Sequence, residues 1–168
     1  IEGNPTTLLY CPMGKTGELL IPKEVRWVEN CAFIKTGLSK ISFEEYDKED
    51  PNYGQQLLEI GNGVAIQPYS SSSTYAVFTG GSLKEVNFPS HLKRLGTLTF
   101  NGLTAAGTKI NFNMDAHLQD IGGLNFYGCT GIAELHLPSV DELGVAVCSN
   151  MTKTTTITFG KNGNLKEI

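Results

Sequence analysis

The sequence predicts a mostly β solenoid built from short parallel strands, and three observations lead to this fold class. A pair of large apolar residues separated by one polar residue recurs six times along the 168 residues. The second members of these pairs stand 22 to 25 residues apart, except for one interval of 45 residues. Two further signatures follow the pairs in a fixed order. Such a period indicates a unit that cannot bury its apolar side alone and therefore stacks on the next unit.

The six pairs are expected to form the strands of one parallel sheet, because apolar residues that alternate with polar ones line a single face of a strand. The long interval is interpreted as one enlarged unit. The sequence therefore reads as a single domain, 1-168, of about six units. Its predicted strands lie near 19-21, 41-43, 86-88, 110-112, 135-137 and 157-159.

Each unit continues with two signatures that complete the turn of the solenoid. The first places two apolar residues three positions apart, as at Leu92 and Leu95. The second is a large apolar residue ahead of a turn rich in Gly, Asn, Thr and Ser, where we expect turns or 3₁₀ segments. These positions are Phe33, Phe78, Phe100, Phe126 and Val147.

The segment from Leu83 to Phe100 reads Leu-x-x-Val-x-Phe-Pro-x-x-Leu-x-x-Leu-Gly-x-x-x-Phe, and the segment 132–147 repeats it. This pattern resembles the BspA-type leucine-rich repeat of bacterial and protozoan surface proteins, and the resemblance covers nearly the whole chain. It departs at Asn113, where Pro is usual, and at Val147, where Phe is usual. The resemblance implies a right-handed leucine-rich-repeat solenoid with turns or 3₁₀ segments on its outer side. It also implies a secreted or cell-surface binding module, adhesion-like and without a catalytic site.

Composition excludes several classes of protein. With 40% hydrophobic and 18% charged residues, the chain is neither collagenous nor a disordered acidic tail. No apolar run approaches the roughly 20 residues of a transmembrane segment, and a net charge of −4 gives no reason to expect nucleic acid or anionic lipid as a partner. The chain begins at Ile1, so any secretion signal was removed or never included. Both ends fall inside a unit, which suggests either a segment of a longer array or a short terminal strand that serves as a cap.

The outward positions of the predicted strands supply the first candidate contact surface. Side chains alternate along a strand, so the residue between each apolar pair faces outward. Three of these residues, Asn87, Asn111 and His136, are candidates for binding a partner. The neighbouring outward column alternates in charge between strands, which we interpret first as control of strand register.

The enlarged unit supplies the second candidate surface, through an insertion at 44-56 and a second loop at 67-75. The insertion is acidic, and the second loop is rich in Ser. Two interpretations stay open: a recognition surface, where Tyr gives contact area at low entropic cost, or a variable loop whose tyrosines pack on their own turn. The candidate residues are Tyr46, Tyr53, Tyr69 and Tyr75.

The ionisable residues point to no catalytic, cofactor or metal site. The four cysteines form no C-x-x-C motif, and no His lies near them at zinc-ligand spacing. Cys129 is expected to be a buried free thiol, although Cys11 with Cys31, or Cys129 with Cys148, could pair in an oxidising compartment. The three histidines have no nucleophile or carboxylate at triad spacing, and all three are expected to be solvated.

The function that follows is a non-catalytic, extracellular or surface-associated binding module for a protein or a glycan. The alternative from another class is a structural spacer, or part of an envelope assembly, that has no ligand of its own. Neither alternative needs a cofactor, and the oligomeric state is left open.

Overall fold

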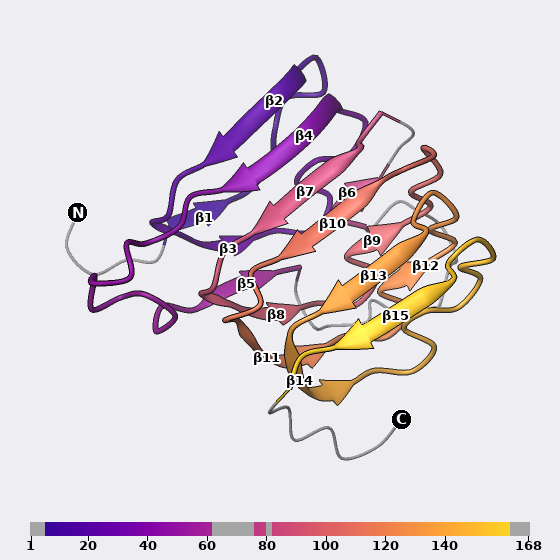
Figure 1. Ribbon diagram of the computed structural model, residues 1–168. Helices are drawn as coiled ribbons and strands as arrows, with labels where there is room; N and C mark the ends of the chain where they lie inside the picture. The colour runs from indigo at the N-terminus through magenta and orange to yellow at the C-terminus, as the bar shows by residue number, and fades with distance from the viewer. Residues whose placement is uncertain (1–5, 62–75, 80–81, 162–168) are drawn as a thin grey trace.

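The computed structural model describes residues 6–61, 76–79 and 82–161, and all regular secondary structure in these residues is β-strand (Figure 1). The six apolar pairs each lie in a strand that runs parallel to its paired neighbours. We call these six the anchor strands. They are β2 (Thr16–Ile21), β4 (Gly37–Phe43), β7 (Glu85–Phe88), β10 (Lys109–Phe112), β13 (Glu134–Leu137) and β15 (Thr156–Phe159).

The signature with two apolar residues three positions apart forms a second parallel sheet, which the sequence analysis did not predict. Its strands follow in the order β1-β3-β5-β8-β11-β14. Leu92 and Leu95 point inward and are fully buried, while the two residues between them reach the surface. The strands of this sheet are β1 (Thr6–Leu8), β3 (Val25–Val28), β5 (Leu58–Ile60), β8 (Leu92–Leu95), β11 (His117–Ile121) and β14 (Ser139–Leu143).

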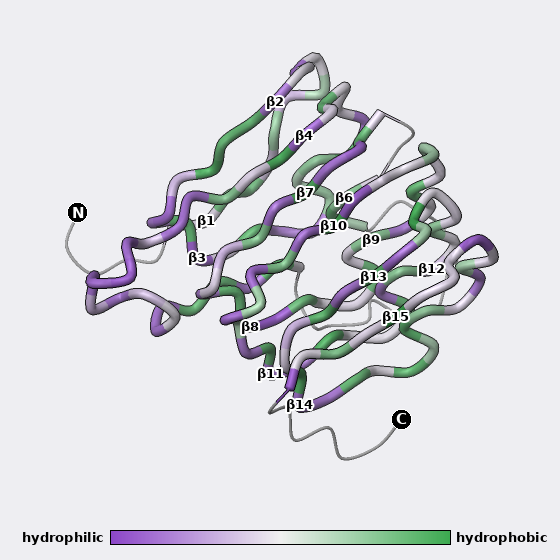
Figure 2. Tube along the Cα trace, viewed as in Figure 1, coloured by the Kyte–Doolittle hydropathy of each residue, from purple (hydrophilic) through white to green (hydrophobic). Residues whose placement is uncertain are grey.

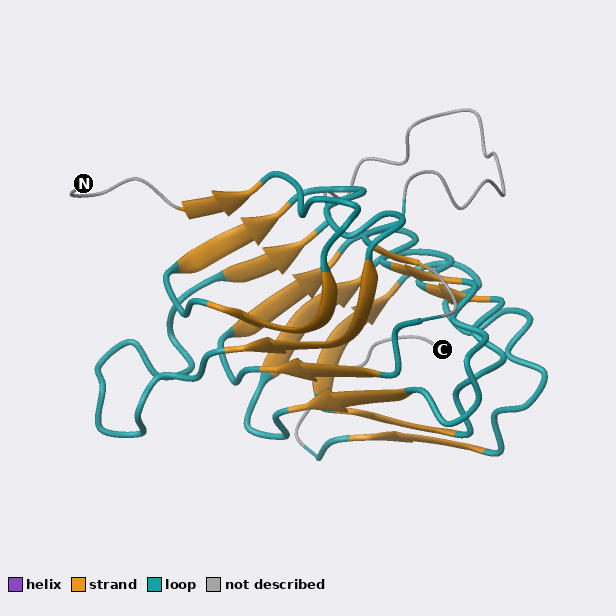
Figure 3. Cartoon of the chain, turned by 90° about the horizontal axis from the view of Figure 1, so that it is seen from above, coloured by secondary structure: helices purple, strands orange, loops and turns teal. Residues whose placement is uncertain are grey.

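Short strands and turns form the third side of the solenoid. Strands β6 (Phe78–Thr79), β9 (Phe100–Asn101) and β12 (Phe126–Tyr127) pair in the order β12-β9-β6. From β5 to β14 the chain visits the three sides of the solenoid in turn, so the coils stack as Figure 3 shows. The expected turns are present on this side, and no 3₁₀ segment is found in the described part of the chain.

Stacked phenylalanines run through the core along the solenoid axis. Phe33, Phe78, Phe100 and Phe126 are each at most 1% exposed. Successive ring centroids are 5.2, 5.0 and 5.1 Å apart, with the rings nearly parallel. Each such pair contributes about 0.5–1.5 kcal/mol beyond the burial of its surface. Figure 2 shows apolar and polar residues alternating along the anchor strands that enclose this stack.

The corner after the second sheet leaves no room for side chains. The Gly122 N–H donates to the Leu95 carbonyl at 2.7 Å, and a Cβ at Gly122 would lie 2.4 Å from the Thr97 nitrogen. Leu124, two residues later, has a φ of 52°, and the equivalent Ala146 has a φ of 57°. This left-handed conformation costs a non-glycine residue about 1–2 kcal/mol. The close approach of the Gly122 backbone to the preceding coil fixes how closely the coils stack at this corner.

The anchor sheet is interrupted between β10 and β13. Strands β10, β7, β4 and β2 form one sheet in that order, whereas β13 and β15 form a separate pair. Strand β13 remains the spatial neighbour of β10, but no hydrogen-bonded ladder joins these two strands. The outer face therefore opens at this point, close to two of the candidate residues.

The expected fold class, a mostly β solenoid with short parallel strands, is confirmed. The 45-residue interval between the second and third apolar pairs forms a single coil of the solenoid. This follows because β4 pairs directly with β7 and sets Ile41 opposite Val86. Residues 44–57 leave the stack between β4 and β5 and form turns.

Candidate binding surface

Outward side chains at the middle of the anchor strands form a hydrogen-bonded polar row. The strand register sets Ser42 opposite Asn87, and Asn87 opposite Asn111. Asn87 Nδ2 donates to Ser42 Oγ at 2.9 Å, and Asn111 Nδ2 donates to Asn87 Oδ1 at 2.7 Å. On the separate pair of strands, His136 Nδ1 lies 2.7 Å from Thr158 Oγ1. The three strand candidates therefore lie on one outer face, linked to their neighbours.

The charged column beside this row is ordered by strand pairing. Glu85 lies opposite both Lys40 and Lys109. Lys40 Nζ is 3.2 Å from Glu85 Oε1, and both side chains are about one-third exposed. The pKa of Glu85 is lowered, first by the hydrogen bond from Asn87 and then by Lys40. Because partly exposed pairs contribute only about 0.2–1 kcal/mol, the column favours the observed register more than it stabilises the fold.

A groove opens on this face where the anchor sheet is interrupted. It lies between β10 and β13 and has a volume of about 370 Å³. Lys109 and Asn111 line it from one strand, and Glu134 and His136 line it from the other. All four residues are exposed. An ammonium, an amide, a carboxylate and an imidazole therefore converge on one space, which can both donate hydrogen bonds to a polar ligand and accept them.

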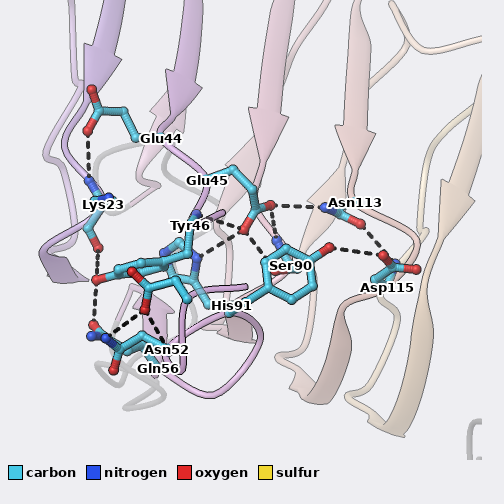
Figure 4. A network of polar contacts seen from close by, with 12 residues as sticks. Lys23, Glu44, Glu45, Tyr46, Asn52, Gln56, Ser90, His91, Asn113 and Asp115 are labelled. Atoms are coloured by element: carbon cyan, nitrogen blue, oxygen red, sulfur yellow. Dashed lines mark hydrogen bonds and ion pairs between the residues drawn. The ribbon is translucent and has the colours of Figure 1, made fainter. Parts of the chain in front are cut away.

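The insertion folds back across the ends of β7 and β10, and Glu45 holds it there (Figure 4). The Glu45 carboxylate accepts hydrogen bonds from the Ser90 N–H at 2.6 Å and the Ser90 hydroxyl at 2.8 Å. It also accepts one from Asn113 Nδ2 at 2.9 Å. Ser90 and Asn113 lie just after β7 and β10, so one side chain ties the enlarged unit to the next two coils.

Two of the four candidate tyrosines face the solenoid itself. Tyr46 is 5% exposed, and its hydroxyl donates to the Lys23 carbonyl at 3.0 Å. The Tyr53 hydroxyl donates to Asp115 Oδ2 at 2.9 Å, and Lys48 Nζ lies 3.4 Å from the same oxygen. Tyr46 is thus a buried anchor of the insertion, which corrects its selection as a contact residue. Tyr53 is partly exposed and keeps its candidacy.

The other two candidates, Tyr69 and Tyr75, lie outside the described residues, as does the loop 67-75. Their role in binding remains a prediction from composition alone.

His91 corrects the expectation that all three histidines are solvated. It is 1% exposed, and its ring makes an edge contact with the Tyr46 ring at a centroid distance of 5.1 Å. Its Nδ1 has no hydrogen-bond partner among the described residues and lies 3.6 Å from Glu45 Oε1. Burial lowers the pKa of His91, although Glu45 acts in the opposite direction. His91 is therefore a neutral core residue at neutral pH, under the base of the insertion.

A second hollow, of about 360 Å³, lies on the second sheet and was missed from the sequence. Stacked outward residues Glu59, Arg94, Asp120 and Glu142 line it, beside glycines that include Gly122. Arg94 Nε donates to Asp120 Oδ2, and Asp120 is the main cause of the raised pKa of Arg94. One signal could have revealed this hollow: the residue before the last apolar position is charged in four consecutive units.

Neither of the two possible disulfides, Cys11 with Cys31 or Cys129 with Cys148, is formed in the structure. Cys129 is buried as expected, and burial raises its pKa to about 11. Among the described residues, no group of three or more His, Cys, Asp or Glu side chains is placed to hold a metal ion. The same residues contain no helix with the length and apolar character needed to cross a membrane.

The strand-and-turn pattern can now be compared with known families. A family model described as "BspA type Leucine rich repeat region (6 copies)" matches residues 13–106 and 64–168, which together extend over nearly the whole chain. Comparisons with curated proteins and with solved structures each find no match.

Proposed function

The chain belongs to the family of BspA-type leucine-rich repeat proteins, and we propose that it is a non-catalytic binding module, secreted or held at the cell surface, with a protein or glycan partner. An adhesion-like role suits this family and this architecture, because stacked repeats build an extended surface for macromolecular partners.

One observation carries the proposal: the groove between β10 and β13 brings together two residues that the sequence selected independently. Asn111 and His136 come from consecutive coils and line the same space. Hydrogen bonds to neighbouring strands, from Asn111 to Asn87 and between His136 and Thr158, hold these two side chains in place beside the groove. The groove is where the face is both concave and exposed, so a partner can replace water there with several hydrogen bonds at once.

The proposal is tested by screening the purified protein against arrayed matrix proteins and glycans, beside two variants. The groove variant carries Asn111→Ala and His136→Ala. The control carries Gln119→Ala and His117→Ala, which remove the same side-chain types from the exposed face of β11. A saturable partner that the groove variant loses by about tenfold or more, and that the control retains, supports the proposal; two lost hydrogen bonds of about 1 kcal/mol each account for such a loss.

Two outcomes would overturn this assignment. A partner that both variants bind as well as the unchanged protein would move recognition away from the groove, and Tyr53→Ser would then test the insertion while leaving Tyr46 in place. No partner at all would favour the spacer role, in which the solenoid has no ligand of its own.

A further inference from the structure

Five exposed lysines gather along one corner of the solenoid, where the anchor strands begin. Each is the first residue of an anchor strand or stands within three residues before one. Because these strands are parallel, their starting ends lie along the same edge of the molecule. We call this set the basic edge: Lys15, Lys35, Lys84, Lys109 and Lys153.

Backbone contacts show that lysines of the basic edge belong to stacked coils. The Lys109 N–H donates to the Lys84 carbonyl at 2.8 Å, and the Gly37 N–H donates to the Lys15 carbonyl at 2.9 Å. Thr154 Oγ1 donates to the Ile132 carbonyl at 2.6 Å, which sets the coil of Lys153 against the one before it. Among the described residues, none of the five ammonium groups takes part in an ion pair or a hydrogen bond.

Charge is distributed unevenly between the two ends of the anchor strands. Among the described residues, three carboxylates lie in the first three residues of the anchor strands, at Glu18, Glu85 and Glu134, and Glu85 is already paired with Lys40. The opposite ends are acidic, with Asp115 after β10 and the acids of the insertion after β4. Those of the insertion are Glu44, Glu45, Asp47, Glu49 and Asp50. A chain of net charge −4 therefore presents a locally positive edge.

We propose that the basic edge binds a linear anionic polysaccharide, a sulfated or carboxylated glycan that lies along the solenoid axis. This inference rests on the proposed function and names its partner class. The six anchor strands lie about 4.8 Å apart, so the edge extends over about 24 Å. A thin, flexible polymer can follow such a row and place its anionic groups against successive ammonium groups.

The groove between β10 and β13 adds hydrogen bonds to this charge pairing. Lys109 belongs both to the basic edge and to the groove. The amide of Asn111 and the ring of His136 lie on the same side of the sheet and suit the hydroxyl groups of a sugar. Charge pairing and hydroxyl recognition thus occur at adjoining sites, which favours a glycan over a simple polyanion.

Other polyanions fit the basic edge less well. Single-stranded nucleic acids are held by aromatic side chains on which bases stack, and no Phe, Tyr or Trp occurs in the stretches 15–18, 35–40, 84–87, 107–111, 131–136 and 153–158. A bilayer surface would need a broad cationic area, whereas this edge is one row wide and is flanked by Glu18 and Glu134.

The test measures binding to a heparin octasaccharide as the probe, with uncharged dextran beside it. The variant carries Lys84→Gln, Lys109→Gln and Lys153→Gln. The matched control carries Lys23→Gln, Lys48→Gln and Lys161→Gln, which remove the same charge from residues that follow the anchor strands or lie in the insertion. All six side chains lie at the surface or partly so, and thermal unfolding of each variant checks that the fold is kept.

We expect heparin to bind, dextran not to bind, and the basic-edge variant to bind heparin on the order of tenfold more weakly, since each exposed charge pair is worth a few tenths to 1 kcal/mol. The control should stay within about twofold of the unchanged protein, and higher salt should weaken binding. Equal losses in both variants, or no loss in either, would overturn the inference. So would tighter binding to single-stranded DNA or to phosphatidylserine vesicles than to heparin.

Failure of this inference can be told apart from failure of the proposed function. If heparin does not bind but an arrayed protein or neutral glycan binds through Asn111 and His136, only the anionic partner class is wrong. If neither the array nor heparin gives a saturable signal, both proposals fail.

Discussion

Glu45 and Ser90 stand 45 positions apart in the chain, yet the Glu45 carboxylate accepts hydrogen bonds from both the backbone N–H and the hydroxyl of Ser90. Ser90 is fully buried, so its N–H has no access to water and depends on this carboxylate. These hydrogen bonds join the start of the insertion to the coil that contains β7.

Replacing Glu45 should therefore destabilise the whole solenoid. Glu45→Ala removes a charged acceptor from a buried N–H, and we expect the free energy of unfolding to fall by about 2 kcal/mol. Urea unfolding followed by circular dichroism measures this change. The control is Glu49→Ala in the same insertion, where the carboxylate is exposed. Equal effects of the two substitutions would show that the Glu45 contacts do not support the fold.

The two described tyrosines of the insertion should differ in their contribution to stability. Tyr46→Phe removes a hydroxyl that bonds the Lys23 carbonyl in a buried setting and should lower the free energy of unfolding by about 1 kcal/mol. Tyr53→Phe removes a hydroxyl bonded to the exposed Asp115 and should have a smaller effect. Thermal unfolding of both variants shows which substitution causes the larger loss of stability. A larger loss for Tyr53→Phe would contradict the burial described for Tyr46.

Acidification should weaken the fold through His91. Burial lowers the folded-state pKa of His91, with Lys93 and Arg26 adding to the effect and Glu45 opposing it. The unfolded chain, in which a histidine has a pKa of about 6.5, therefore binds the proton first as the pH falls. Stability from neutral His91 is complete above about pH 6.5 and is lost as the pH decreases below it.

This pH dependence is measured by comparing urea unfolding at pH 7.5 and pH 5.5 for the unchanged protein and for His91→Gln. His117 and His136 are present in both proteins, so their contributions cancel. The unchanged protein should lose more stability than the variant over this interval. A steeper loss in the variant would mean that the pKa of His91 is raised in the fold.

The glycine corner should tolerate no side chain. Gly122→Ala would place a methyl group 2.4 Å from the Thr97 nitrogen and 2.6 Å from the Gly96 carbonyl carbon, and both are backbone atoms that cannot rotate away. We expect a loss of about 3 kcal/mol or more. Gly14→Ala is the control, since its methyl group would have no neighbour within 4 Å. If both variants unfold alike, the coils are not held apart by backbone contact at this corner.

The anchor strands could be predicted because their apolar residues alternate with polar ones. Pairs such as Val86 and Phe88 follow the period of two that a half-buried strand requires. The large apolar residues ahead of the turns were also visible, since Phe100 and its equivalents follow the pairs in the same order, but the stacking of their rings was not predicted. The second sheet escaped prediction because Val25 and Val28 are both buried with two surface residues between them, a pattern without strand alternation.

The site was predicted only in part, because its geometry depends on contacts between distant residues. Alternation alone put Asn111 and His136 on the outer face, but the interruption between β10 and β13 has no local signal in the sequence. The burial of Tyr46 and His91 likewise follows from the folding back of the insertion, which joins residues about 45 positions apart. The composition of the insertion suggested that its tyrosines are exposed, but packing against the solenoid buries Tyr46.

The most direct test of the central claim is amide hydrogen exchange of the unchanged protein, with and without the array partner that gives the strongest saturable signal. Binding in the groove should slow exchange in peptides that cover 107–111 and 131–136, and leave 117–121 on the other sheet unchanged. Slowed exchange confined to 44–57 or to 117–121, with none at the groove, would contradict the assignment of binding to the face between β10 and β13.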